Sequence, residues 1–255
     1  MKVRFAYDNL IDYSQTVITA ATESATLPVK NVQNHLRTKV YRTGNTQTGE
    51  SIVFDLGAAK TAAFVAILNH NLKQADTGIR LQANSSNSWA TPPFTQTLTW
   101  RAGPISAFFS PQTYQFWRVS FTKTAASETR DIGRIFIGPY YEPPDDIGNR
   151  AISITQNDTS KTSRTIGGQS YSDIRGLYET VTVNFKLVSH AQHNAFKDMA
   201  AKVGTHTPFF FMLDYDVEPE KWLYYVKFSR LQSHKATVLG GVYYWDVSMR
   251  MDEQL

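Results

Sequence analysis

Carboxylates alternate with other side chains in the segment Asp214–Glu220, whose sequence is Asp-Tyr-Asp-Val-Glu-Pro-Glu. In an extended chain, residues two positions apart share a face, so Asp214, Asp216 and Glu218 could offer oxygens to one Ca²⁺ ion. The segment lacks the glycine and the glutamate spacing of an EF-hand loop. We therefore favour an exposed acidic hairpin tip over a metal site.

Two histidines, His190 and His193, lie three positions apart and share one face of a helix predicted there. Imidazole is a common metal ligand, but a metal site needs a third ligand, and no recognisable spacing supplies one. We interpret both residues as surface histidines and predict no metal site.

The sequence lacks the short motifs of nucleophilic and nucleotide-dependent enzymes. The segment Gly168–Ser172 ends in serine where a nucleophile elbow has glycine. No phosphate-binding glycine loop and no dinucleotide fingerprint occurs. The chain has no cysteine, which excludes disulfides and thiolate chemistry. We expect no catalytic residue, no cofactor and no enzymatic activity.

One aromatic residue lies among amides in a pattern that suits a sugar. Trp89 follows Asn84 and Asn87 in the polar run Asn-Ser-Ser-Asn-Ser-Trp. A sugar-binding face uses an aromatic ring for stacking and amides for hydrogen bonds. We include Tyr41 and Arg42, from another loop, in this candidate sugar-binding site. A tryptophan at this position can also close one end of a β-sandwich core, and we favour this structural role over sugar binding.

The composition indicates a protein with part of its surface covered. The 255 residues include 26 Lys and Arg against 22 Asp and Glu, a net charge of +4. This charge is too weak to indicate a nucleic-acid site, so no sequence-specific nucleic acid is expected. Charged residues make up 19% and aromatic residues 13% of the chain, and an average soluble domain is about 25% charged. We infer that other protein subunits cover some of the surface.

No targeting or membrane-spanning segment is expected from the sequence. Polar residues interrupt the first thirteen positions, so a signal-peptide core is absent. The longest apolar run, Ala62–Leu68, is far too short to cross a bilayer. We expect folding in a cytoplasm and no membrane insertion.

The chain is predicted to contain two domains, residues 1–143 and 151–255, joined by a linker at residues 144–150. Pro143 and Pro144 interrupt regular structure at this boundary. The first domain alternates short apolar strands with polar turns, which is typical of an all-β sandwich or jelly roll. The expected strands include Ser51–Leu56 before a turn at Gly57, Ala63–Leu68, Ile79–Ala83, Phe116–Phe121 and Ile132–Ile137.

The second domain is predicted to be mainly β-structure with one α-helix. Alternation over Glu179–Leu187 indicates a strand. Ser189 and Gln192 then form a capping box for a helix at about residues 190–203, which ends at Gly204. Three further strands follow the helix, so a β-sandwich or barrel carrying one helix is expected.

Two segments give the first domain a family resemblance. They are the strand end Phe54-Asp55-Leu56-Gly57 and the strand Phe116-Trp117-Arg118-Val119. It resembles discoidin-like, galactose-binding-like jelly rolls, in which both patterns recur. The segment Leu68–Leu72 is similar to versions found in tail proteins of bacteriophages. The resemblance implies a sugar-binding type of fold for the first domain.

The second domain resembles the distal tail proteins of bacteriophages in Tyr178–Leu187, the helix, Pro208–Asp214 and Tyr243–Met249. The resemblance implies a tail-tube-like β-sandwich that assembles as a ring of identical subunits, usually a hexamer, at the distal end of a long non-contractile tail. The implied partners are the tail tube protein, the tail-tip hub and other baseplate proteins, and the tape measure protein. The chain differs from the commonest arrangement because its galactose-binding-like domain precedes the ring domain.

The segment 157–176 is the first candidate contact between subunits. It is polar, it contains Lys161, Arg164 and Arg175, and it fits either a long hairpin that reaches a neighbouring ring or a flexible surface loop. The acidic segment 214–220 is the second candidate contact. The leading hypothesis is a structural virion protein at the tail tip, assembled in the bacterial cytoplasm. The alternative hypotheses are a carbohydrate-binding protein for host adsorption and an accessory module of a hydrolase.

Overall fold

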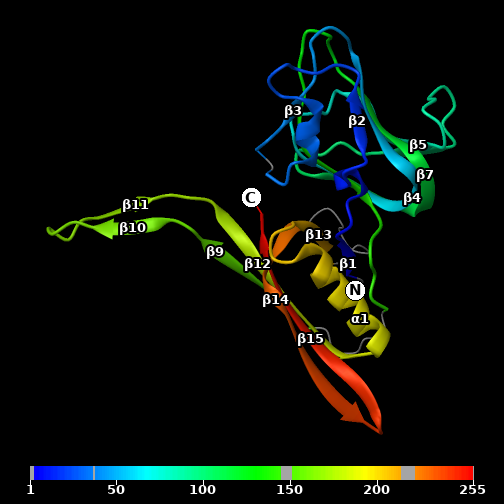
Figure 1. Cartoon of the computed structure of the whole chain (residues 1–255). Helices are drawn as coiled ribbons and strands as arrows, with labels where there is room; N and C mark the ends of the chain where they lie inside the picture. Colours follow the sequence, from blue (N-terminus) through cyan, green and yellow to red (C-terminus); the bar gives the residue numbers. More distant parts are fainter. Residues whose placement is uncertain (1–2, 37, 145–150, 214–221, 255) are drawn as a thin grey trace. The chain divides into compact units, whose positions relative to one another are not determined.

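The computed structural model describes residues 3–36, 38–144, 151–213 and 222–254 of the chain. The chain divides into two compact units, whose elements are labelled in Figure 1. The inserted unit is Asp8–Tyr140, and the helix unit combines Met1–Tyr7 with Tyr141–Leu255. Each unit buries its own hydrophobic core, as expected of a domain that folds separately.

The inserted unit is an antiparallel β-structure with two short 3₁₀ turns. Its strands follow the hydrogen-bonded order β3-β8-β4-β7-β5-β6, and β2 pairs with β4. The first part of β4 pairs with β2 and its last part with β8, while β7 pairs with both parts. The elements are η1 (Leu10–Asp12), β2 (Val17–Ala20), η2 (Val29–Gln33), β3 (Tyr41–Arg42), β4 (Gly49–His70), β5 (Thr77–Asn84), β6 (Phe94–Thr97), β7 (Ile105–Thr122) and β8 (Asp131–Gly138).

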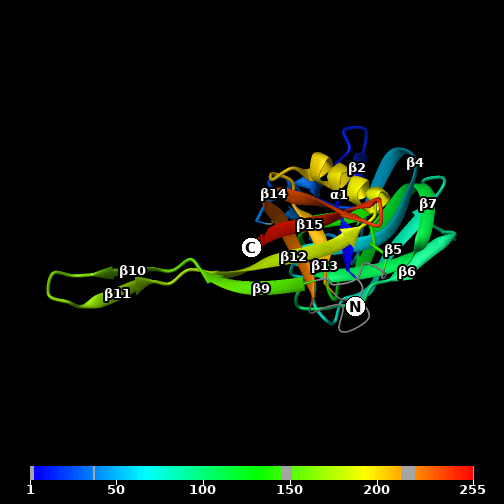
Figure 2. The same cartoon turned by 90° about the horizontal axis from the view of Figure 1, so that it is seen from below.

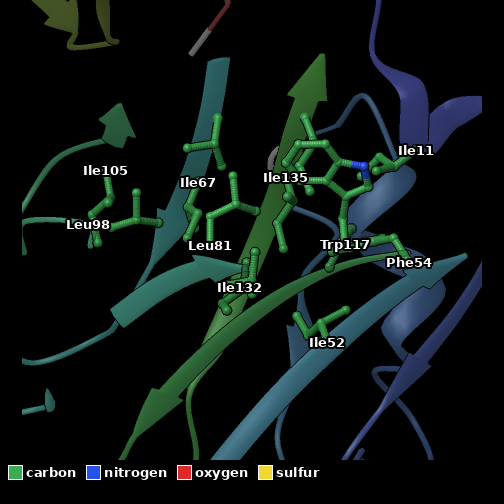
Figure 3. Packing of buried hydrophobic residues seen from close by; sticks show 14 of the residues in the cluster. Ile11, Ile52, Phe54, Ile67, Leu81, Leu98, Ile105, Trp117, Ile132 and Ile135 are labelled. Carbon is green, nitrogen blue, oxygen red and sulfur yellow. The ribbon is translucent and has the colours of Figure 1, made fainter. Parts of the chain in front are cut away.

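Alternating side chains build the core of the inserted unit. On β7, Trp117, Val119 and Phe121 are buried, while Arg118 and Ser120 lie on the opposite face. Figure 3 shows Trp117 packed among aliphatic side chains from several strands. The two-residue period predicted for this strand is therefore present, and it places Arg118 outside the core.

The helix unit is a six-stranded antiparallel sheet with one α-helix among its described residues. The strand order is β1-β13-β14-β15-β12-β9, and β10 pairs with β11 in a separate ribbon. Figures 1 and 2 show this ribbon at the far end of the β9–β12 pair. The elements are β1 (Arg4–Ala6), β9 (Ala151–Asp158), β10 (Lys161–Arg164), β11 (Ser170–Asp173), β12 (Leu177–Val188), α1 (His190–Val203), β13 (Phe209–Met212), β14 (Leu223–Leu239) and β15 (Val242–Glu253).

The predicted helix is confirmed as α1, and its ends are those that the sequence indicates. Ser189 and Gln192 form the reciprocal capping box, and Gly204 ends the helix at a φ of 54°. The apolar side of α1 enters the core, where the Phe196 ring lies 4.8 Å from that of Phe185. The predicted fold class, mainly β-sandwich with one helix, is confirmed.

The structure differs from the predicted domain boundary at the N-terminus. We expected residues 1–143 in one domain, but β1 pairs with β13, with Phe5 opposite Phe211. Residues 1–7 therefore belong to the helix unit, and the other unit is inserted after its first strand instead of preceding it. A strand as short as Arg4–Ala6 carries no local signal for a partner strand two hundred residues away. Of the predicted linker 144–150, all but Pro144 lies outside the described residues.

No helix in the described part of the chain has the length and apolar character needed to cross a membrane.

Candidate functional site

The candidate sugar-binding residues Asn84, Asn87 and Trp89 lie together at the end of β5 and in the loop that follows. Asn84 Nδ2 donates a hydrogen bond to the Ser88 carbonyl at 2.7 Å, and Trp89 Nε1 donates to Asn87 Oδ1 at 2.7 Å. These bonds fold the loop back on itself and fix the orientation of the indole. The amides are thus engaged within the loop, while the Trp89 ring is only partly buried.

A fourth residue, Arg118 of β7, completes this cluster. The Arg118 guanidinium carbon lies 4.6 Å from the centre of the Trp89 ring, a cation–π contact. Arg118 Nε and Nη2 donate to Gln82 Oε1 at 2.9 and 2.6 Å. Burial lowers the pKa of Arg118 from its usual value, but a guanidinium remains charged at any physiological pH. The sequence places Arg118 in a fold pattern and gives no contact between it and Trp89. Its outward position on an alternating strand is the one local signal for a surface role.

Tyr41 and Arg42 are not part of the Trp89 cluster. In the hydrogen-bonded order, β8, β4 and β7 lie between their strand and β5. Tyr41 is fully buried, its hydroxyl donates to the Thr22 carbonyl at 2.6 Å, and burial raises its pKa. Arg42 forms a two-point ion pair with Asp131, at 2.6 and 2.7 Å. Tyr41 is therefore a core residue and Arg42 a strand-pairing residue, and both differ from the predicted role.

The candidate contact segment 157–176 forms a projecting hairpin instead of an irregular loop. It contains the end of β9, the β10–β11 ribbon and the approach to β12. Lys161 and Arg164 are exposed, and Arg175 pairs with Asp173 at 2.7 Å on the surface. Asp214, Asp216 and Glu218, the acidic candidates, lie outside the described residues.

Among the described residues, exposed apolar side chains gather in the helix unit. Thirteen large hydrophobic side chains of the described residues are exposed, and eleven belong to residues 151–255. They are Ile154, Ile166, Tyr171, Ile174, Leu177, Leu187, Leu231, Val238, Leu239, Val242 and Tyr243. Exposed apolar side chains in such number are typical of a surface that contacts another protein.

Four of these side chains, Ile154, Leu177, Val238 and Tyr243, continue the core-facing rows of two hairpins. In the β9–β12 pair, the buried Val181 lies opposite Ile154, and Leu177 follows on the same face of β12. In the β14–β15 pair, Ala236 lies opposite the partly buried Trp245, and the next pair on that face, Val238 and Tyr243, is exposed. The two hairpins therefore extend apolar faces beyond the part of the sheet that their own core covers.

The expectation of two surface histidines on α1 is wrong for one of them. His190 is exposed, but His193 is buried, and its ring stacks on Trp245 at 4.0 Å and an interplanar angle of 6°. His234 packs edge-on against His193 at 4.8 Å. Burial and neighbouring positive charges lower the pKa of both His193 and His234. Within the described residues, no group of three or more His, Asp or Glu side chains could hold a metal ion.

Comparison with known proteins gives a structural similarity only. No family model matches the chain. No curated protein matches it either. Similar solved structures include a GH29 fucosidase of Ruminococcus gnavus in complex with fucose, at 13% identity and a TM-score of 0.44. That alignment covers 52% of this chain and 27% of the fucosidase chain.

Two shorter proteins are similar over nearly their whole length. A CBM32 module of Clostridium perfringens is 17% identical with a TM-score of 0.42, covering 53% of this chain and 100% of the module. A fucose-binding module of Streptococcus pneumoniae is 12% identical with a TM-score of 0.42, covering 51% of this chain and 96% of that module.

Proposed function

We propose that this chain is a structural protein that self-associates through the hairpins of its helix unit. The observation that carries the proposal is the concentration of exposed apolar side chains there, eleven of thirteen in the described residues. Removing such side chains from water stabilises an assembly by about 25 cal/mol per Å² of apolar surface. Self-association would cover the two apolar faces that the core of a single chain leaves exposed.

The β10–β11 ribbon is the part of the helix unit that we expect to contact another copy. Ile166 is fully exposed and Ile174 is 87% exposed. Lys161 and Arg164 are also exposed, so the ribbon presents both apolar and cationic groups. Interfaces combine an apolar centre with a charged rim in this way.

Sedimentation velocity over a concentration series tests self-association. The wild-type chain should shift to larger species as its concentration rises. A double variant, Ile166→Asn with Ile174→Asn, should shift at a much higher concentration while its melting temperature is unchanged, because neither side chain contributes to the core. Ser163→Asn, an exposed polar change on the same ribbon, is the matched control. A wild-type chain that stays monomeric at the highest concentration would overturn the proposal.

The resemblance to phage distal tail proteins extends this proposal to a specific assembly. We propose a non-catalytic ring, with a hexamer as the expected state, at the distal tail end of a virion. Its partners would be the tail tube protein, the tail-tip hub and baseplate proteins, and the tape measure protein. The position of the inserted unit within the helix unit supports the proposal, because a peripheral domain is usual in such rings. Six-fold density in images of tail tips that contain this chain is the test.

A second function, carbohydrate binding by the inserted unit, is favoured by the Trp89 cluster. An indole fixed by Asn87 beside the charged Arg118 is a rigid platform for a sugar ring. A glycan array probed with the wild type and with Trp89→Ala tests this function. Binding that is lost in the variant supports a glycan-binding role. No binding by either protein would leave the inserted unit with a scaffold role.

A further inference from the structure

A groove lies on the outer face of the inserted unit, over β4, β5 and β7. Its volume is about 470 Å³, and it is bordered by Ser51, Thr77, Arg80, Arg118, Ser120 and Thr122, among others. The groove therefore begins at Arg118, the residue that contacts Trp89, and continues along the same face of the sheet. Hydroxyl groups and two guanidinium groups are its main polar features.

The charge of the groove is positive. Arg80 and Arg118 come from neighbouring strands, where Arg80 lies opposite Ser120 and Gln82 lies opposite Arg118. Among the described residues, neither arginine forms an ion pair. Glu50 also borders the groove, but its carboxylate is fully buried and pairs with Lys123 at 3.0 Å. In the part of the chain that the structure describes, the two cations thus have no counterion on this face.

Arg118 is already held in place for a ligand. Gln82 Oε1 accepts from its Nε and Nη2, and the Trp89 ring covers the guanidinium at 4.6 Å. Its Nη1 forms no hydrogen bond with any described residue. A side chain fixed before binding loses little conformational freedom when it binds, so its hydrogen bonds contribute more to affinity.

We propose that this groove binds an acidic glycan, in which a carboxylate or sulfate group pairs with Arg80 and Arg118. Charge-assisted hydrogen bonds from a guanidinium are stronger than neutral ones and fit planar or tetrahedral anions. Ser51, Thr77 and Ser120 supply hydroxyl partners for the hydroxyl groups of the sugar. An acidic protein surface is the competing occupant, and the hydroxyl lining beside an indole favours a sugar. The inference rests on the proposed carbohydrate-binding role and specifies its ligand class.

Isothermal titration with four oligosaccharides tests the ligand class. The carboxylated probe is tetragalacturonate, and its fully methyl-esterified form is the neutral control on the same backbone. A sulfated galactan tetrasaccharide and unmodified galactotetraose form the second pair. We expect binding of at least one charged probe, weakened by added salt, with the neutral member of its pair at least about tenfold weaker.

Single-charge variants then locate the binding groups. Arg80→Gln and Arg118→Gln should each weaken binding of the charged probe by about tenfold, the value of one charge-assisted hydrogen bond. Lys39→Gln removes the same charge from an exposed residue outside the groove and should leave affinity unchanged. Arg80 is exposed, so its variant stays informative even if Arg118→Gln disturbs the sheet.

The outcomes separate this inference from the proposed carbohydrate-binding role. If neutral and charged probes bind equally and the arginine variants behave as wild type, the acidic ligand class is overturned. Loss of that binding in Trp89→Ala would keep the glycan-binding role. If no probe binds, the acidic ligand class is overturned, and the glycan array with the wild type and Trp89→Ala decides the carbohydrate-binding role separately. If, in addition, Arg80→Gln changes the sedimentation of the chain, the groove is a protein contact.

Discussion

Lys123 lies at the centre of a buried polar network in the inserted unit, and its replacement tests how that unit is held together. Its side chain and that of Glu50 are both fully buried, with 3.0 Å between Lys123 Nζ and Glu50 Oε1. The same ammonium group donates to the carbonyls of Gly44 at 2.7 Å and Glu128 at 2.8 Å. The three acceptors come from separate segments, so one side chain connects them. Thr22 Oγ1 contacts both Glu50 oxygens, at 2.9 and 2.8 Å.

Lys123→Met keeps most of the side-chain volume and removes the charge. The change leaves the Glu50 carboxylate buried without its cation, which costs about 3–5 kcal/mol in comparable sites. Two carbonyl groups also lose a donor, at about 1–3 kcal/mol each when no water replaces it. These costs are not additive, because the chain can relax, so we expect the unfolding free energy to fall by about 4–5 kcal/mol. A typical domain has only about 5–15 kcal/mol in total.

Urea unfolding, followed by hydrogen exchange and mass spectrometry of peptides, measures this loss in each unit separately. A single unfolding free energy for the whole chain is not well defined when two units unfold independently. Peptides from Asp8–Tyr140 should show a midpoint lowered by about 2 M or more, at a slope of about 2 kcal/mol/M. Peptides from 151–255 should be unchanged. Lys39→Met, at an exposed position of the same unit, is the control.

A double variant, Lys123→Met with Glu50→Gln, decides whether the charge is the cause. If the uncompensated Glu50 carboxylate causes the loss, adding Glu50→Gln should recover about 2 kcal/mol, because a neutral amide is less costly to bury. A loss below about 1 kcal/mol in Lys123→Met, or no recovery in the double variant, would refute the reasoning. The first result would mean that water replaces the ammonium, and the second that packing dominates.

Three further predictions concern the backbone, the helix start and pH. Gly138→Ala should destabilise the inserted unit by about 1–3 kcal/mol or more, measured by urea unfolding, because an added Cβ would lie 2.0 Å from the Asp8 carbonyl oxygen. Ser189→Ala should cost the helix unit about 1 kcal/mol by loss of the cap, measured in the same way. The lowered pKa values of His193 and His234 mean that the unfolded chain binds protons more readily, so the helix unit should lose stability as pH falls below about 6.5. Exchange of α1 peptides across pH measures this loss, and His193→Phe should reduce it.

The elements predicted correctly from sequence are those with local signals. The helix was found from Ser189, Gln192 and Gly204, which act within one or two turns of the chain. Alternation located most of β12 in the same way. Gly57 was expected to separate two strands, and the structure instead has one strand, β4, whose register shifts between Asp55 and Lys60. A register shift and a turn can have the same sequence pattern, a glycine between two apolar runs. Here the glycine is Gly57, at a φ of 74°.

The candidate sites were predictable only where their residues are close in sequence. Asn84, Asn87 and Trp89 lie within six positions, and the structure brings them together. Arg118 reaches Trp89 through the β5–β7 pairing, which the sequence does not specify. Tyr41 has the same aromatic character as Trp89, and only its burial shows that it belongs to the core. Residue type indicates chemistry, and the strand order decides which residues share a site.

The two residues that flank the inserted unit lie side by side in the helix unit. Phe5 and Tyr141, which flank the insertion in the helix unit, exchange backbone hydrogen bonds of 2.9 and 2.8 Å. Arg4 and Glu142 form an ion pair beside them at 2.5 Å. The helix unit therefore holds the two points at which the insertion begins and ends side by side. An insertion between these points requires no rearrangement of the sheet of the helix unit.

The low charge and high aromatic content of the chain consequently have two different causes. In the inserted unit, aromatic residues such as Phe54 and Trp117 fill a closed core, and the face with Arg80 and Arg118 suits a small anionic ligand. In the helix unit, apolar residues such as Ile166 and Tyr243 remain exposed on two hairpins, which suits a second protein. Because the two surfaces belong to units with separate cores, ligand binding and assembly should respond to different substitutions, and neither set should alter the other function.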